Sequence, residues 1–264
     1  MKVNVQKICD FMEKIAPLNY AEDWDNVGLM LGDSKNEVKK VMIALDLDLN
    51  VVIAAIDKKV DMIITHHPLF FKPIKNLNYD SEANKSICLL IKNNIAVYSA
   101  HTNLDSTKGG VNDVLCEILE LKNSEVLIKS KYEGVGLGRI ASINNETSLR
   151  AYASFVKSKL NLTRIKIADA GKNVNKIAIC GGSGSDFIED AIKLGADTYL
   201  TGDVKYHEAQ YAIRNGLNLI DASHQFTEMP IVKSLKIRFQ EWVLENNYEV
   251  KVCNANETEV IEIL

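Results

Sequence analysis

The spacing of hydrophobic residues along the chain alternates between the period of a helix and that of a strand. Val5, Ile8, Met12 and Ile15 recur at helical spacing, which predicts an amphipathic helix over residues 4–16. The same two periods predict strands at 41–45, 60–64 and 95–99 and helices at 51–59, 86–92 and 111–119. The first half of the chain is therefore predicted to alternate between helices and strands.

The hydrophobic pattern weakens between residues 121 and 133, where Lys, Ser and Asn residues gather, and this loss indicates a domain boundary. A second alternating series follows it. Its predicted elements are helices at 149–160, 186–194, 204–215 and 228–245, and strands at 164–168, 176–180, 197–200, 217–221, 248–252 and 259–263. Pro230 falls in the first turn of the last predicted helix, where proline is tolerated.

These alternating elements predict an α/β fold with mixed, largely parallel sheets covered by helices. The length of 264 residues fits one large domain or two of ordinary size. We assign residues 1–125 and 226–264 to a first domain and residues 126–225 to a second. The two halves also echo each other weakly in the order of their elements.

Composition and charge exclude several classes of protein. Hydrophobic residues make up 47% of the chain and charged residues 25%, which is the balance of a globular protein and not of a disordered or collagen-like one. The net charge of −4 disfavours nucleic-acid binding, because duplex-binding proteins ordinarily carry a basic face. No apolar run approaches the roughly 20 residues of a membrane helix, so we expect no membrane association.

The N-terminus and the cysteines indicate a cytoplasmic location. Asp10, Glu13 and Lys14 interrupt any apolar core of a signal peptide. The five cysteines are odd in number, form no C-x-x-C pair and lie in apolar stretches, as the buried thiols of a reducing compartment do. A zinc site built from thiolates is therefore not expected.

Histidines follow the ends of three predicted strands. His66 and His67 come directly after one apolar run, His101 follows the next, and His224 follows the strand predicted before the last long helix. In open α/β sheets, ligands bind beyond the carboxyl ends of the strands. These four side chains are therefore candidates for one binding site.

Two of these histidines are followed four residues later by a carboxylate. Asp105 follows His101 and Glu228 follows His224, so each pair shares one face if the backbone is helical there. Mixed nitrogen and oxygen ligands suit Zn, Fe, Mn or Ni better than Ca or Mg. A bridging carboxylate such as Glu228 could hold two divalent ions, an arrangement that activates water in hydrolytic sites. Too few protein ligands are present to saturate two ions, which is typical of catalytic sites.

Each histidine also has a plainer interpretation. A single histidine after a strand is ordinarily a polar surface residue or a hydrogen-bonded core residue. The adjacent pair His66 and His67 is less ordinary, because neighbours in a regular strand point to opposite faces. Both can face one site only where the chain leaves the strand, and Pro68 predicts that departure. The recurrence of the pattern in three segments favours the metal site.

Five segments together carry a resemblance to a known family. They are Trp24-Asp25-Asn26-Val27-Gly28, Thr65-His66-His67-Pro68, His101-Thr102-Asn103-Leu104-Asp105, Gly202-Asp203-Val204-Lys205-Tyr206-His207 and His224-Gln225-Phe226-Thr227-Glu228. In this order they resemble the GTP cyclohydrolase 1 type 2 homologue family, also called the Ngg-interacting-factor-like family. The resemblance covers essentially the whole chain, and the combination of motifs is highly specific.

The resemblance implies two related three-layer α/β/α domains with a dinuclear metal site in the cleft between them. One divalent ion would take His67, Asp105 and Glu228. The other would take His66, His224 and again Glu228, which would bridge the two ions. The identity of the metal stays open among Zn, Fe, Mn and Ni.

The resemblance also implies supporting residues and an assembly. His101 and His207 would line the same pocket as supporting or proton-transfer groups. Family members form ring-shaped homohexamers, and longer relatives insert an extra domain that this chain is too short to contain. Ser223 departs from the family pattern, which has glycine before the last histidine; a serine there can alter the local turn but removes no ligand.

The family name implies opening of the guanine imidazole ring of GTP. That reaction needs a triphosphate pocket, yet the sequence contains no G-x-x-x-x-G-K-[ST] loop and few basic residues near the motifs. We therefore expect a metal-dependent hydrolase that acts on a small molecule, with nucleotides as the first class to test. Two alternatives stay open: a dinuclear phosphatase or phosphodiesterase, and a metal-binding scaffold or regulatory ring without catalytic activity.

Two glycine-rich segments have both a functional and a structural interpretation. Residues 181–185, Gly-Gly-Ser-Gly-Ser, either hold a phosphate with their backbone N–H groups or form a tight turn that Asp186 caps. The spacing of these glycines matches no dinucleotide-binding fingerprint, which favours the turn. Gly134, Gly136 and Gly138 either shape a pocket or lie in a glycine-rich strand, and the strand is favoured.

The early segment at residues 24–26 also has two interpretations. The plainer one is a packed tryptophan, Trp24, followed by an Asx turn. The functional one, which comes from the resemblance, turns Asp25 and Asn26 toward the pocket. The sequence does not choose between them.

Overall fold

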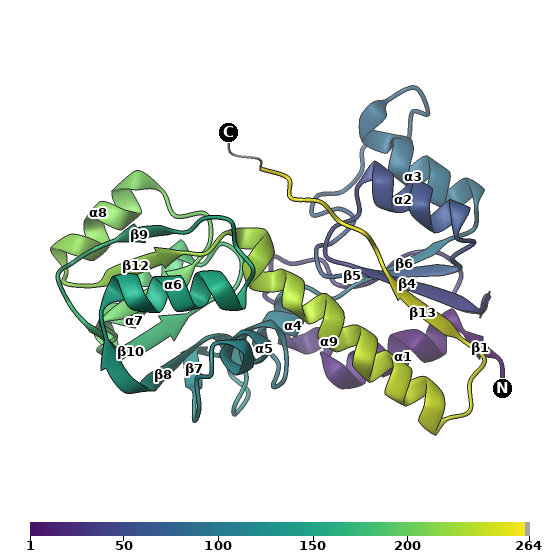
Figure 1. Ribbon diagram of the computed structural model, residues 1–264. Coiled ribbons are helices and arrows are strands. Elements are labelled where there is room, and N and C mark those ends of the chain that lie inside the picture. The colour runs from purple at the N-terminus through teal and green to yellow at the C-terminus, as the bar shows by residue number, and fades with distance from the viewer. Residues whose placement is uncertain (262–264) are drawn as a thin grey trace. The chain divides into compact units, whose positions relative to one another are not determined.

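The computed structural model describes residues 1–261, except for the side chains of residues 82 and 83, and the chain forms two compact units. Unit 1 consists of residues 1–104 and of the C-terminal segment from Val232 onward, and unit 2 consists of residues 105–231. The divisions fall within two helices, α4 (Thr102–Ser106) and α9 (His224–Glu245). Figure 1 labels most of the helices and strands of both units.

Unit 1 is built on a five-stranded sheet with the order β13-β4-β5-β6-β2. Its strands are β2 (Gly28–Leu31), β4 (Lys40–Ala44), β5 (Met62–Thr65), β6 (Ala96–Ser99) and β13 (Lys251–Asn254). The pairings among β13, β4, β5 and β6 are parallel, and β2 closes the sheet antiparallel to β6. A separate ribbon pairs β1 (Val3–Asn4) with β3 (Glu37–Val38). Because strands β4 to β6 are almost wholly buried, they appear in the sequence as continuous apolar runs.

Helices cover both faces of this sheet. The helical elements are α1 (Val5–Ile15), α2 (Leu49–Asp57), α3 (Glu82–Lys92) and a 3-10 turn at Leu18–Tyr20. On one face, Val52 of α2 and Leu90 of α3 belong to the same buried cluster as Ile63 of the sheet. Figure 1 shows α1 on the opposite face, where Phe11 stacks on Trp242 from the C-terminal part of α9 with ring centroids 4.6 Å apart. Unit 1 therefore has three layers, α/β/α.

Unit 2 holds a six-stranded sheet with the order β7-β8-β10-β11-β12-β9. Its strands are β7 (Glu125–Lys129), β8 (Gly136–Thr147), β9 (Lys166–Ala168), β10 (Val174–Ile179), β11 (Thr198–Thr201) and β12 (Asn218–Asp221). β10, β11 and β12 are parallel neighbours. β7, β8 and β9 join them antiparallel, so the sheet is mixed, as predicted.

The helices of unit 2 also lie on both faces of its sheet. They are α5 (Val111–Ile118), α6 (Leu149–Lys159), α7 (Ile188–Lys193) after a 3-10 turn at Ser185–Phe187, and α8 (Tyr206–Arg214). Leu115 of α5 and Val156 of α6 pack in one buried cluster with Ile177 of the sheet. Ala191 of α7 packs with Tyr199 in a second cluster, which Ala212 of α8 completes. The α5 segment therefore belongs to unit 2.

Three helices begin at polar residues that cap them. The side chains of Asn4, Asp48 and Ser148 each accept a hydrogen bond from the backbone N–H three residues further on. These bonds satisfy donors that the first turn of a helix leaves without a partner. They fix the starts of α1, α2 and α6 at Val5, Leu49 and Leu149.

The two units share one structural repeat. In unit 1, Asp61 accepts a hydrogen bond from the backbone N–H of Lys40, 21 residues earlier, and in unit 2 Asp197 accepts one from Lys176, also 21 residues earlier. The Nζ of each of these lysines donates to a backbone carbonyl 18 residues after it. These matched bonds align β4-α2-β5-α3-β6 with β10-α7-β11-α8-β12. The prediction of two related α/β/α domains is thereby confirmed.

Several elements differ from those that the hydrophobic pattern predicts. β2, β7 and β8 are absent from the prediction, because glycines and exposed polar residues interrupt the alternation there. The start of the last long helix at residue 228 was wrong: α9 begins at His224, and Pro230 lies inside it. The strand predicted at 259–263 is not formed at residues 259–261, and residues 262–263 lie outside the described part of the chain.

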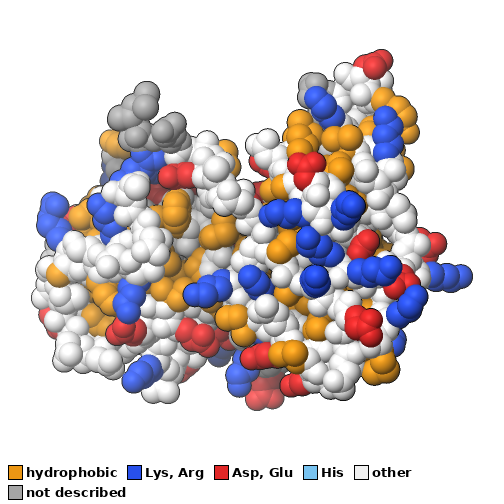
Figure 2. Space-filling model, turned by 45° about the vertical axis from the view of Figure 1, so that its right-hand side comes forward, with side chains coloured by type: hydrophobic (Ala, Val, Ile, Leu, Met, Phe, Trp, Pro, Cys, Tyr) orange, Lys and Arg blue, Asp and Glu red, His pale blue; other side chains and the backbone are white. Residues whose placement is uncertain are grey.

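No helix in the described part of the chain is both long and apolar enough to span a membrane. Even α9, with its 22 residues, carries several lysine, arginine and glutamate side chains. On the face drawn in Figure 2, basic and acidic side chains are interspersed among apolar ones. This distribution is typical of a protein surface of mixed charge.

Candidate metal centre

The histidines of unit 1 follow the carboxyl ends of three neighbouring parallel strands. β4, β5 and β6 end in register, with Ala44 paired to Thr65 and Thr65 paired to Ser99. Asp46 follows β4, His66 and His67 follow β5, and His101 follows β6. Because adjacent parallel strands end at the same edge of a sheet, this topology gathers the four side chains at one place.

The three imidazoles of unit 1 lie within reach of one metal ion. One ring nitrogen from each of His66, His67 and His101 lies within 4.8 Å of the corresponding atoms of the other two. Their ring centroids are 5.0 to 5.7 Å apart. His66 is fully buried, and the side chains of the other two are less than one-fifth exposed.

Each of these imidazoles has its Nδ1 bonded to an oxygen. His66 Nδ1 is 2.9 Å from the backbone oxygen of Ala100, His67 Nδ1 is 2.7 Å from Asp46 Oδ1, and His101 Nδ1 is 2.9 Å from an oxygen of Asp25. Carbonyl and carboxylate oxygens accept hydrogen bonds, so Nδ1 must carry the proton in each ring. The lone pair of each ring is therefore on Nε2, as in histidines that bind metals through Nε2.

Asp25 is held ionised beneath His101. Its side chain is fully buried, and it accepts hydrogen bonds from His101 Nδ1 and from the backbone N–H and the hydroxyl of Thr102. Burial by itself would raise the pKa of Asp25, but these hydrogen bonds outweigh it and hold the pKa at about 2. Asp25 therefore turns toward the site, whereas Trp24 is 63% exposed and not packed in the core.

The C-terminal segment positions the carboxylate that orients His67. Glu257 accepts hydrogen bonds from the backbone N–H of Leu45, at 2.9 Å, and of Asp46, at 2.7 Å. Burial raises the pKa of Glu257, although these two N–H groups act in the opposite direction. The loop that carries Asp46 is thus held by a residue more than 200 positions further along the chain.

Unit 2 repeats the arrangement of a carboxylate that orients a histidine. Asp203 follows β11 and His224 follows β12, the next parallel strand. His224 Nδ1 is 2.8 Å from Asp203 Oδ2, and the two residues are 21 positions apart, as Asp46 and His67 are. In both units a carboxylate after one strand therefore sets the tautomer of the imidazole after the next strand.

The early start of α9 brings His224 and Glu228 together. The two residues lie one helical turn apart, and His224 Nε2 is 3.1 Å from Glu228 Oε2. The Thr227 hydroxyl is bonded to the backbone oxygens of Ser223 and His224 and to the N–H of Gly182. These contacts hold the first turn of α9 in place.

Asp105 lies in unit 2 near the carboxylate of Glu228. Burial raises the pKa of the Cys180 thiol, and the negative charges of Asp105 and Glu228 raise it further. Asn112, which is fully buried, donates to the backbone oxygen of Asp105 at 3.1 Å and accepts from the N–H of Gly181 at 3.0 Å. Asn112 therefore ties the Asp105 turn to the glycine loop that packs on Glu228.

The glycine loop at 181–185 makes room for Glu228. The backbone N–H groups of Gly181, Gly182 and Gly184 donate to the side chains of Asn112, Thr227 and Thr201, so they are not turned to a phosphate. A Cβ at Gly182 would lie 2.1 Å from Glu228 Oε1. This loop is a structural turn, as predicted, but the cap at Asp186 was wrong, because neither the 3-10 turn nor α7 has a side-chain cap.

Ser223 occupies a backbone conformation that favours glycine. Its φ is +66°, in the left-handed region, which costs a residue with a side chain about 1–2 kcal/mol. Ser223→Gly removes that cost but adds chain entropy to the unfolded state, so we expect a net stabilisation of about 0.5–1 kcal/mol. Thermal unfolding should show a midpoint a few degrees higher. Ser158→Gly on the exposed face of α6 is the control and should lower the midpoint.

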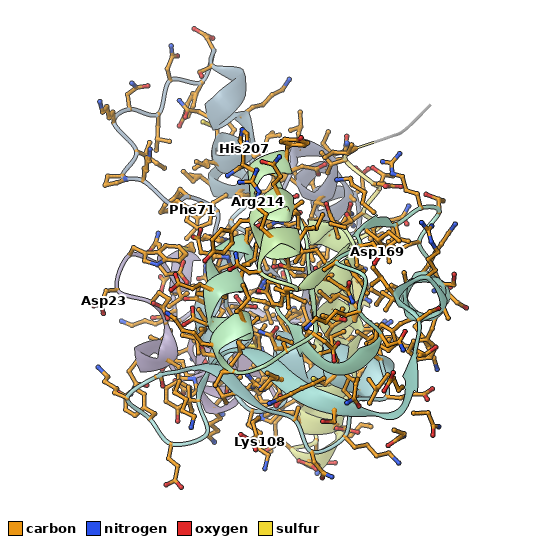
Figure 3. The ribbon with its side chains drawn as sticks, turned by 90° about the vertical axis from the view of Figure 1, so that its left-hand side faces the viewer. Asp23, Phe71, Lys108, Asp169, His207 and Arg214 are labelled. Carbon is orange, nitrogen blue, oxygen red and sulfur yellow. The ribbon has the colours of Figure 1, made fainter. Side chains whose placement is uncertain are left out.

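His207 lies apart from the buried ligands of unit 2. It is exposed on the first turn of α8, where its ring contacts Tyr206 at a centroid distance of 5.3 Å (Figure 3). Among the described residues, no group of three ligand atoms close enough for one metal ion includes it. Its proton-transfer role stays a prediction.

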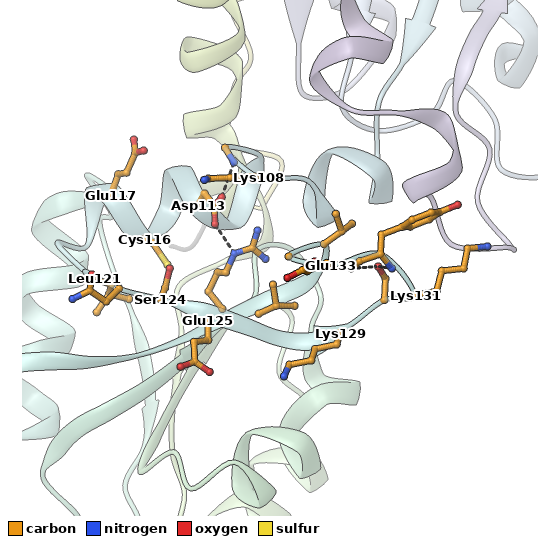
Figure 4. A pocket seen from close by; sticks show the side chains of 18 residues that line it. Lys108, Asp113, Cys116, Glu117, Leu121, Ser124, Glu125, Lys129, Lys131 and Glu133 are labelled. Atoms are coloured by element: carbon orange, nitrogen blue, oxygen red, sulfur yellow. Dashed lines mark hydrogen bonds and ion pairs between the residues drawn. The ribbon is translucent and has the colours of Figure 1, made fainter.

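The glycines at 134–138 lie at the hairpin between β7 and β8. Gly136 and Gly138 belong to β8, as the strand interpretation predicts. The hairpin also walls a pocket of about 1130 Å³ in unit 2, shown in Figure 4, whose charged side chains are of both signs. Arg139 in its wall is bonded to Asp113 and to backbone oxygens of Gly136 and Gly138. None of the predicted metal ligands lines this pocket.

The predictions from sequence omitted the oxygens that orient the histidines. Asp46 and Asp203 each come two residues after a buried strand, which is the same signal that identifies the histidines. Asp25 is indicated only by the family resemblance, and Glu257 carries no local signal at all. Strand-end carboxylates could therefore have been found from the sequence, whereas Glu257 could not.

Comparison with known proteins agrees with this architecture. The family model described as Duf34/NIF3 (NGG1p interacting factor 3) matches residues 3–259. Proteins named GTP cyclohydrolase 1 type 2 homolog from Clostridium acetobutylicum and Clostridium perfringens are each 39% identical, over 88% and 91% of this chain and 88% and 92% of their own. The crystal structure of a hypothetical protein from Staphylococcus aureus has a TM-score of 0.92 at 30% identity and covers 99% of both chains. The chain belongs to the Duf34/NIF3 (NGG1p interacting factor 3) family.

Proposed function

We propose that this protein is a dinuclear metal-dependent hydrolase that acts on a nucleotide or a related small molecule. One observation carries the proposal. Four imidazoles at the carboxyl ends of parallel strands all have Nδ1 bonded to an oxygen, and two buried carboxylates accompany them. Histidines that only fill a hydrophobic core are not required to share one tautomer. Histidines that bind a metal through Nε2 ordinarily carry the proton on Nδ1 and donate it to an oxygen. The name of the relatives, GTP cyclohydrolase 1 type 2 homolog, supports the nucleotide class.

In this proposal five side chains would supply the protein ligands of two divalent ions. Glu228 would be shared by the two ions, and His66, His67, Asp105 and His224 would complete their protein ligands. The donor set fits such ions chemically, because imidazole nitrogen and carboxylate oxygen suit Zn, Fe, Mn and Ni. When bound, the ions would supply the Lewis acidity that makes water nucleophilic near neutral pH.

His101 is assigned the proton transfer. Its Nδ1 is committed to Asp25, so a proton can arrive only at Nε2. The resulting imidazolium would be stabilised by Asp25, which its hydrogen bonds keep ionised. A positioned histidine of this kind contributes about 10²- to 10⁴-fold to a rate.

Asp203→Asn tests whether the oriented histidines serve metal binding. Asn tolerates the left-handed φ of +56° at this position, so the fold should be retained. The amide oxygen can still accept a hydrogen bond from His224 but lacks the negative charge of the carboxylate. We therefore expect zinc affinity to fall by roughly 10-fold, which is the lower end of the loss for residues that orient a metal ligand. Competition with a chromogenic chelator measures it. Asp186→Asn, at an exposed position of the same unit, should leave the affinity unchanged.

The function is tested by metal content and by product analysis. Protein purified without affinity nickel is reconstituted with Zn, Mn or Fe, and its metal content is measured by plasma mass spectrometry. The loaded protein is then incubated with GTP and a nucleotide panel, and formate, phosphate and pyrophosphate are quantified. About two ions per chain together with hydrolytic turnover would support the proposal.

Each other outcome points to a definite alternative. Release of phosphate instead of formate from GTP would identify a phosphatase or phosphodiesterase. Two ions per chain without turnover of any nucleotide would favour the metal-binding scaffold or regulatory ring. Absence of metal after every reconstitution would overturn the proposed centre. The hexameric ring stays a prediction from the family resemblance, and light scattering coupled to size-exclusion chromatography tests it.

A further inference from the structure

Two exposed aromatic rings flank His101 in unit 1. The ring centroid of Trp24 lies 6.1 Å from that of His101, with an interplanar angle of 75°. The ring centroid of Phe71 lies 5.4 Å from that of His101, with an interplanar angle of 78°. Trp24 is nevertheless 63% exposed and Phe71 is 51% exposed. Large aromatic side chains ordinarily bury most of their surface. Two aromatic side chains that are more than half exposed beside one imidazole therefore indicate a binding role.

Both rings are held where they are by the residues next to them. Asp25, which follows Trp24, is bonded to His101 and Thr102, and Glu22 N–H donates to the Thr102 hydroxyl at 3.0 Å. Asn26 Nδ2 donates to the backbone oxygen of Phe70 at 2.8 Å and so joins the two loops. Figure 3 labels Phe71 and Asp23, the residue before Trp24, on these loops. The rings are therefore exposed on anchored backbone and not on a loose terminus.

We propose that Trp24 and Phe71 form an aromatic subsite that stacks the planar ring of the substrate beside His101. This inference rests on the proposed function, because it names the substrate class of the same site. Stacking needs only a π-face, so the two rings bind planar ligands with little dependence on their substituents. The edge of such a ligand would face His101, whose Nδ1 is bonded to Asp25 and whose Nε2 can accept a hydrogen bond from a ring N–H, which a hydrocarbon edge lacks. The ligand class is thus a nitrogen heteroaromatic ring, such as a purine, and not an apolar aromatic side chain.

Tryptophan fluorescence gives a direct test, because the chain contains only two tryptophans. Trp242 packs on Phe11 in unit 1, so Trp242→Phe leaves Trp24 as the single emitter with an aromatic ring retained. This protein is titrated with guanosine monophosphate, and with ribose 5-phosphate as the probe that lacks the base. Both titrations are run on metal-free and on zinc-loaded protein, with excitation at the red edge of tryptophan absorption.

We expect saturable quenching by guanosine monophosphate and none by ribose 5-phosphate, in both metal states. In the same background, Phe71→Ala should raise the Kd by roughly 5- to 150-fold, the usual loss for removal of one stacking ring. Tyr79→Ala is the matched control. Tyr79 is 61% exposed in the same unit, and its ring lies beneath the Nζ of Lys92 and not beside His101. It should leave the Kd unchanged.

The result separates this inference from the proposed function. Quenching by the base in protein that binds no metal would keep the subsite and reject the metal centre. Two bound ions without base-dependent quenching would keep the metal centre and reject the subsite. Equal quenching by ribose 5-phosphate, or equal effects of Phe71→Ala and Tyr79→Ala, would also overturn the subsite.

Discussion

Glu228→Ala is expected to abolish binding of both metal ions. Glu228 is the carboxylate assigned to both, it is 3% exposed, and it lies 3.1 Å from the Nε2 of His224. Its loss would leave each ion with two protein ligands, fewer than catalytic sites ordinarily provide. Plasma mass spectrometry after reconstitution should find about two ions per wild-type chain and essentially none in the variant, and turnover should vanish with them.

The stability of the metal-free variant should not fall in parallel. Glu228 and Asp105 are both buried and both act electrostatically on the Cys180 thiol, so removal of one relieves repulsion between buried negative charges. The thermal midpoint of metal-free Glu228→Ala should therefore equal or exceed that of the metal-free wild type. Glu241→Ala, at an exposed position of the same helix α9, should keep both ions. Retention of one or two ions by Glu228→Ala would refute the bridging assignment.

Gly182→Ala is expected to weaken metal binding strongly although Gly182 is no ligand. The new Cβ would lie 2.1 Å from Glu228 Oε1 and 3.1 Å from its Cδ, so the carboxylate must move. The end of a glutamate side chain can shift at modest cost, which means that the fold survives but the ligand is displaced. We expect zinc affinity to fall by roughly 100-fold, the upper end for changes next to a metal ligand.

A matched glycine separates displacement from backbone strain. Gly182 has φ +69° and Gly195, in the same unit, has φ +75°, so alanine is strained by about 1–2 kcal/mol at either position. A Cβ at Gly195 meets nothing within 4 Å. Both variants should therefore unfold at lower temperature than the wild type, and only Gly182→Ala should lose zinc affinity in chelator competition. Equal affinities in the two variants would show that Gly182 does not position Glu228.

The sequence predicted correctly the strands that are buried on both faces of their sheet. Strands β4, β5 and β6 lie in a sheet covered on both faces, so each is a continuous apolar run that can be recognised locally. β8 was missed because its second half, residues 142–147, is largely exposed and polar. α9 was predicted to begin too late, because Pro230 marks a first helical turn in most helices but lies here in the second.

The candidate ligands were accessible from the sequence for a general reason. Parallel strands end at one edge of their sheet, so polar residues that directly follow consecutive strands must gather there, wherever the rest of the chain goes. His66, His67 and His101 satisfy that condition in the sheet of unit 1, and His224 follows a parallel strand of the sheet in unit 2, so all four could be named from their positions. Asp105 and Glu228 followed from helical spacing, four residues after two of these histidines.

The contacts that orient these ligands depend on residues far apart in the sequence. Glu257 holds the loop of Asp46 from 211 residues away, and Asp25 is bonded to His101 across 76 residues. The need for glycine at position 182 arises from a side chain of α9 and not from any local turn. Hydrophobic periodicity records only which face of an element is buried, and it says nothing about which distant partner a polar group meets. The candidate ligand residues could thus be named from the sequence. The tertiary structure was needed to show the tautomers of the histidines, the oxygens that orient them, and the exposure of the Trp24 and Phe71 rings.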